Sequence, residues 1–142
     1  VLATEIAKLL STPVWAYLFD HFNFIKIRMA MTGLIMAHVV IYYNVHHPLW
    51  LVIGTVLLGV AFGGGHLAWS LWVTKFAPPE ETARYMSVHT FMNGIRGIIG
   101  PWLGYLSVQH LGIRPTAWIA AGIMLLSIAL LYRIRNLPTR LS

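Results

Sequence analysis

The chain has 142 residues, of which 58% are hydrophobic and only 10% are charged, and its mean hydropathy is +0.70. In a soluble domain of this size about a quarter of all residues are charged, so the composition excludes an ordinary soluble fold. The net charge of +6 does not indicate a nucleic-acid-binding protein, because the basic residues lie between apolar runs instead of in one cluster. The absence of cysteine excludes disulfides and thiolate metal sites.

Five apolar segments follow one another, and each has about the length that a membrane-spanning helix requires. They cover residues 1–19, 27–46, 49–74, 85–109 and 115–133. The links between them are short, so neighbouring helices should run antiparallel. A β-barrel would need shorter spans that alternate apolar and polar residues. The sequence therefore predicts an all-α fold, a polytopic bundle of about five transmembrane helices in one domain over residues 1–142.

The distribution of basic residues predicts the orientation of this bundle. Seven lie on one side of the predicted spans: Lys26, Arg28, Lys75, Arg84, Arg133, Arg135 and Arg140. The opposite side has only Arg114, and lysine and arginine accumulate in cytoplasmic loops. We therefore expect an integral protein of the cell (inner or plasma) membrane, surrounded by lipid, with its C-terminus in the cytoplasm. Because the chain opens inside an apolar stretch, we also expect further helices of the same chain upstream.

A polar stripe crosses the fourth predicted span. His89, Asn93 and Arg96, followed by Gly100, are spaced so that they share one helix face. A charge near the bilayer centre costs at least about 2.5–3.5 kcal/mol, so Arg96 needs a partner or a water-filled cavity. The stripe indicates a cavity wall, where Arg96 binds an anionic group of a solute or an acid that is released during transport. A static ion pair with Glu5 or with an acid upstream is the alternative.

Other polar residues inside the predicted spans are weaker candidates for the same cavity. Glu5 and Lys8 lie three residues apart on one helix face, where they can neutralise each other. His38, His66 and His89 suggest either a proton relay or axial ligation of haem. No two of these histidines have ligand-like spacing on one helix, and His66 joins Glu5 and Lys8 among the cavity candidates.

Glycine and proline mark two places where a span can bend or pack closely. Gly100 and Pro101, followed by Gly104, combine a proline kink with two glycines four residues apart. The triplet at residues 63–65 suggests a flexible point in the third span. The sequence shows no carboxylate pair, no Ser-His-Asp set and no metal-ligand spacing, which predicts a protein that is not an enzyme and has no metal or cofactor.

Two motifs resemble the major facilitator superfamily of transporters, specifically a C-terminal fragment that covers approximately helices 8 to 12. The first is Ala16 with Asp20 four residues later, followed by Lys26 and Arg28. It is similar to the degenerate copy of the cytoplasmic family signature, in which a small residue and an aspartate precede basic residues. The second motif runs from residue 100 to 104 and is similar to a Gly-Pro-x-x-Gly core, which the internal repeat of the family places in the eleventh helix.

The resemblance implies that helices nine and twelve face lipid while helices eight, ten and eleven line the core. It also implies transport by two six-helix halves that close alternately around a midplane site, driven by a substrate or ion gradient. Asp20 would belong to a cytoplasmic gate, with Lys26 and Arg28 as its local partners.

The leading functional hypothesis is secondary active transport of a small solute across the membrane. A cationic site suggests an anionic solute, and coupling to a proton or another ion through His89 or Glu5 is a further option. Two alternatives from other classes stay open: a haem-binding membrane electron carrier and a non-transporting membrane scaffold.

Overall fold

The structure, a computed structural model, describes residues 2–135 apart from the side chains of Ser70, Thr74 and Lys75. Its elements are α1 (Leu2–His21), α2 (Phe24–Asn44), α3 (Pro48–Phe76), the short 3-10 helix η1 (Pro79–Glu81), α4 (Thr82–Leu111) and α5 (Ile113–Arg133). The described range has no strand, which confirms the predicted all-α class. Each predicted apolar segment falls on one α-helix, with ends that differ by at most three residues. Arg140 lies outside the described residues.

Three parts of the described chain are long and apolar enough to cross a membrane: α2, the Pro48–Trp69 part of α3, and α5. The other two helices are also long, with 20 residues in α1 and 30 in α4. However, α1 contains Glu5 and Lys8 and α4 contains Arg96, and each of the two helices has an internal proline. That α1 and α4 also cross the membrane stays a prediction.

Side chains at the short links start the second and third helices. Asn23 is the N-cap of α2, where its Oδ1 accepts the Ile25 N–H at 2.8 Å. His47 caps α3 in the same way, and Pro48 takes the first helical position, where its missing N–H costs nothing. These caps satisfy donors that have no partner inside the helix.

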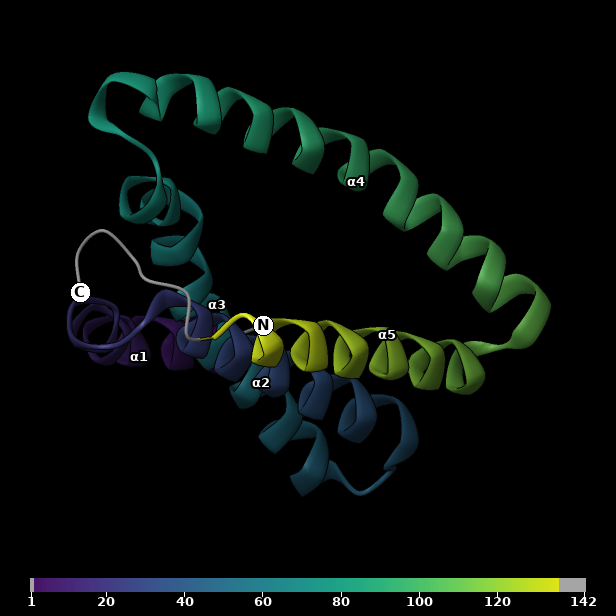
Figure 1. Cartoon of the computed structure of the whole chain (residues 1–142). Coiled ribbons are helices and arrows are strands. Elements are labelled where there is room, and N and C mark those ends of the chain that lie inside the picture. The colour runs from purple at the N-terminus through teal and green to yellow at the C-terminus, as the bar shows by residue number, and fades with distance from the viewer. Residues whose placement is uncertain (1, 136–142) are drawn as a thin grey trace.

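The centre of the molecule is α3, with α1 and α2 packed against it and α5 packed against α2 (Figure 1). Hydrogen bonds fix α2 and α5 to each other at both ends. Asn23 Nδ2 donates to the carbonyl oxygen of Arg135 at 3.2 Å, and Trp118 Nε1 donates to Asn44 Oδ1 at 3.1 Å. Because the beginning of each helix lies beside the end of the other, α2 and α5 run antiparallel, as the short links predict.

Glycines of α3 allow α1 to approach it closely. A Cβ atom built on Gly59 would overlap the carbonyl oxygen of Thr4 and lie 2.8 Å from Ala7 Cβ. One built on Gly64 would lie 2.7 Å from the indole of Trp15, whose Nε1 donates to the Val60 carbonyl oxygen. Small residues serve the same purpose in other membrane helix pairs. Residues 63–65 lie inside the continuous helix α3, where Gly63 and Gly64 provide close packing and a Cβ atom at Gly65 would meet nothing within 4 Å. The flexible point that their sequence suggests stays a prediction.

The helix α4 stands apart from the other helices (Figure 1). None of its described residues is buried, and its contacts with α3 are few compared with its contacts with α5. Large apolar side chains are exposed along it, such as Ile98 at 77% and Trp102 at 61%. In water so much apolar surface would cause association, whereas in a bilayer it contacts lipid tails or further helices.

Candidate functional site

A cavity of about 280 Å³ lies where α2, α3, α4 and α5 face one another. Seven aromatic, charged or amide side chains line it. They are Arg28 and Phe24 of α2, Trp69 and Trp72 of α3, and His89, Asn93 and Arg96 of α4. We call this space the four-helix cavity.

His89 is held at the wall of the four-helix cavity by residues of two helices. Its ring centroid lies 4.8 Å from that of Trp69 and 5.0 Å from that of Trp72, both in edge-on geometry. Asn93, one turn further along α4, donates from Nδ2 to the His89 carbonyl oxygen at 2.9 Å and lies 2.8 Å from His89 Nε2. The few contacts between α3 and α4 thus include an aromatic cluster around one imidazole.

Two guanidinium groups line the four-helix cavity, Arg28 from the beginning of α2 and Arg96 from the middle of α4. Neither has an ion-pair partner among the side chains that the structure describes, where the only ion pair joins Lys8 to Glu5. All four acidic residues of the chain lie elsewhere than the cavity lining. The cavity therefore has an uncompensated positive potential within this part of the protein.

The indole of Trp72 adds an unsatisfied hydrogen-bond donor. Its Nε1 atom is buried and has no hydrogen-bond partner in the described part of the chain. A buried donor without an acceptor costs about 1–3 kcal/mol. An acceptor group could recover that free energy only if the indole turned to expose Nε1, which is buried in the described structure.

Two further hollows adjoin the four-helix cavity. The larger, of about 490 Å³, shares Trp72 and His89 with it and is also lined by Glu81 and Arg84. The other shares Trp69 with it and is lined by His66. The two predicted residues His66 and His89 therefore line different but neighbouring spaces.

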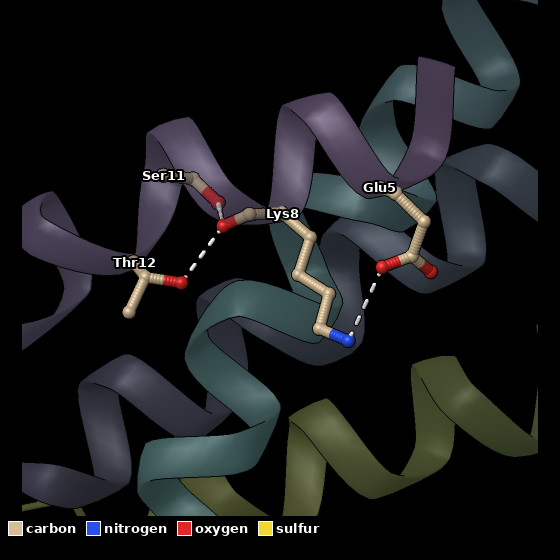
Figure 2. A network of polar contacts seen from close by, with 4 residues as sticks. All are labelled: Glu5, Lys8, Ser11 and Thr12. Atoms are coloured by element: carbon tan, nitrogen blue, oxygen red, sulfur yellow. Dashed lines mark hydrogen bonds and ion pairs between the residues drawn. The ribbon is translucent and has the colours of Figure 1, made fainter. Parts of the chain in front are cut away.

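The predicted candidates on α1 lie outside the four-helix cavity. Lys8 Nζ is 3.4 Å from Glu5 Oε2, and this pair lies on an exposed face of α1 (Figure 2). The Lys8 carbonyl oxygen accepts hydrogen bonds from Ser11 and Thr12, at 3.1 and 2.8 Å (Figure 2). The structure thus brings His89, Asn93 and Arg96 together as one group, while Glu5 and Lys8 neutralise each other on another helix.

The residues expected at a cytoplasmic gate are separated. Asp20 is exposed in the last turn of α1 and makes no ion pair within residues 2–135 with either expected partner. Lys26 lies in a surface hollow with Tyr132 and Arg135, whereas Arg28 lines the four-helix cavity. Sequence reasoning assigned Arg28 to the cytoplasmic gate and did not predict that it lines this cavity with Phe24, which lies four residues earlier on α2. The gate stays a prediction.

The glycine-proline segment of α4 is helical throughout. Pro101 lies inside α4 and removes one backbone N–H donor, but the helix continues to Leu111. A Cβ atom built on Gly100 or Gly104 would meet no atom within 4 Å. This face of α4 therefore has no packing partner among the described residues, and its role in bending or packing stays a prediction.

The comparison with protein families decides which class of protein this is. The model of the Major Facilitator Superfamily matches residues 1–141. The chain belongs to this family. The family that its sequence motifs suggested is therefore confirmed, and the chain belongs to an integral membrane transporter of small molecules. Its correspondence to helices 8 to 12 stays a prediction. No curated protein and no solved structure matches it.

Membership of the Major Facilitator Superfamily does not favour the haem alternative, and neither does the placement of the histidines. His38 donates from Nδ1 to the Gly54 carbonyl oxygen at 2.8 Å, so this nitrogen already has a partner between α2 and α3. His89 lies in the aromatic cluster with Trp69 and Trp72. Within the described residues, no group of three or more His, Asp or Glu side chains is placed to hold a metal ion.

Proposed function

We propose that this chain belongs to a secondary active transporter that moves a small solute by alternating access, with the four-helix cavity on the path of the solute. The observation that carries the proposal is the position of Arg96. It lines a cavity together with His89 and Asn93, and it has no acidic partner in the part of the chain that the structure describes. Ionisable groups at membrane depth mark solute or ion pathways as a rule.

The loose attachment of α4 supports the same proposal. Alternating access requires one group of helices to move against another around a central site. Arg96 belongs to α4, the one α-helix with no buried residue among those described, and the few contacts of α4 with α3 include the cluster around His89. Few apolar contacts have to be broken when such a helix moves.

The proposal is tested with the full-length protein in proteoliposomes, using a panel of radiolabelled organic acids, amino acids and sugars. Uptake of at least one solute should depend on an imposed gradient and stop when an ionophore collapses that gradient. Arg96→Ala should then lower uptake at least about tenfold, since a hydrogen bond to a charged group contributes about 1.5–3 kcal/mol.

Arg133→Ala is the matched control, because it removes an exposed arginine of α5 that does not line the four-helix cavity. It should leave uptake close to that of the unchanged protein. If Arg96→Ala retains both expression and full uptake, the solute path does not run along this wall of α4 and the proposal is wrong.

A further inference from the structure

The four-helix cavity also has the chemistry to select its solute, an inference that rests on the proposed function because it concerns the same site. We propose that the cavity takes a small organic anion with a planar apolar body. The acidic group lies between Arg28 and Arg96, and the body lies against the indole rings of Trp69 and Trp72.

The first step of the argument is charge. Arg28 and Arg96 reach one cavity from different helices, and no acid among residues 2–135 lines it. Two guanidinium groups that share a space repel each other, and an oxyanion between them relieves this repulsion. Guanidinium groups bind the two oxygens of such an anion in a fork geometry that an ammonium group cannot reproduce.

The second step is the apolar wall. Trp69 and Trp72 lie three residues apart on α3, so they present neighbouring rings on one helix face. Phe24 extends this surface, since its ring stacks with Trp72 at a centroid distance of 6.4 Å and an interplanar angle of 24°. Aromatic rings recognise planar apolar groups through their large contact area and offset stacking. A simple inorganic anion would leave this surface unused.

The third step is the unsatisfied indole N–H. Trp72 Nε1 is buried without an acceptor in the described structure, and its side chain lines both the four-helix cavity and the larger hollow beside it. An anion brings acceptor oxygens, and it can take this hydrogen bond in addition to those of the arginines once the indole turns its buried Nε1 toward the cavity. The cavity of about 280 Å³ opens beside another of about 490 Å³, which together suit a small organic molecule.

The experiment uses three probes with the purified full-length protein in detergent: benzoate, its neutral isostere benzamide, and acetate, which lacks the ring. Equilibrium dialysis of radiolabelled probes gives the dissociation constants. We expect saturable binding of benzoate at least about tenfold tighter than that of benzamide and of acetate, because each competitor loses one of the two recognition elements. Equal binding of benzoate and benzamide overturns the proposal. This holds even if an acidic residue in another part of the protein pairs with the arginines.

Variants then test whether Arg28, the residue that sequence reasoning placed at the cytoplasmic gate, supplies part of this charge. Arg28→Gln should weaken benzoate binding at least about tenfold and leave benzamide binding unchanged, and Arg28→Lys should give an intermediate affinity. Arg133→Gln removes the same charge from an exposed position of α5 and should leave benzoate binding unaltered. Equal losses in Arg28→Gln and Arg133→Gln would show a general surface-charge effect and overturn the assignment.

The failures of the two proposals are distinguishable. If Arg28→Gln does not fold, the ratio of benzoate to benzamide affinity in the unchanged protein still decides whether the site selects anions. Gradient-driven uptake of a neutral or cationic solute that depends on Arg96 would retain the proposed function and overturn the anion inference. Selective benzoate binding without uptake of any solute would retain the anion site and overturn the transport proposal.

Discussion

The contact between α1 and α3 gives a sharp test of the fold through the substitution Gly59→Ala. A methyl group at Gly59 would overlap the Thr4 carbonyl oxygen, approach Thr4 C to 3.0 Å and lie 2.8 Å from Ala7 Cβ. Two of these atoms belong to the backbone, which no side-chain rotation can move away. The two helices would therefore have to separate along their whole contact, including the packing of Gly64 on Trp15.

The magnitude follows from two opposing effects. Forcing an extra methyl group into a packed contact costs about 1–3 kcal/mol. Replacing glycine by alanine inside a helix gains about 0.5–1 kcal/mol, because the unfolded chain loses conformational freedom. We therefore expect Gly59→Ala to lower the free energy of unfolding by roughly 0–2.5 kcal/mol, with a central value of about 1 kcal/mol, once these terms are combined.

Gly65→Ala provides the matched control on the same helix. A Cβ atom built at Gly65 meets nothing within 4 Å, so only the favourable propensity effect applies, with a gain of about 0.5–1 kcal/mol. The assay is reversible unfolding of the purified protein in mixed micelles with an increasing fraction of denaturing detergent, followed by circular dichroism. The two variants should shift the midpoint in opposite directions. A rise in stability for both would mean that α1 and α3 do not approach each other as closely as described.

Two further substitutions test the ends and the middle of α2 in the same unfolding assay. Asn23→Ala removes the cap of α2 and the hydrogen bond to Arg135, and it should cost about 0.5–2 kcal/mol; an unchanged midpoint would argue against the cap. His38→Leu removes the 2.8 Å hydrogen bond to the Gly54 carbonyl oxygen and should lower the free energy of unfolding by about 0.5–1.5 kcal/mol. The absorbance spectrum of the purified protein in the haem region should not change. A stabilised variant would contradict this contact.

The helices could be predicted from the sequence because the bilayer fixes both their length and their composition. An apolar run of about 20 residues between polar links has few alternatives to a membrane helix. The ends of α2 and α4 were less certain, since each helix begins three residues earlier than the apolar run does. At α2 the earlier start adds Phe24 and Lys26 to the helix, whereas Arg28 already lies inside the predicted span.

The lateral arrangement was harder to predict. Gly59 and Gly63 lie four residues apart in α3 and form a small-residue pattern that predicts a close helix contact, but nothing in that pattern identifies α1 as the partner. The stripe of His89, Asn93 and Arg96 predicted a shared face correctly, because helical periodicity is a local property. The contribution of Arg28 to the same cavity depends on the position of α2 relative to α4. Periodicity within one helix does not determine that relative position.

The turn between α4 and α5 has a consequence for any motion of the outer helix. Gly112 is both the C-cap of α4 and the N-cap of α5, and its φ of +86° is the only positive φ among the described residues. A side chain there would strain the backbone, so glycine is the residue that this geometry favours. Only this one residue separates α4 from α5. A rotation of α4 must therefore change the backbone torsion angles around Gly112, or else rotate α5 together with the helix α2 that packs against it.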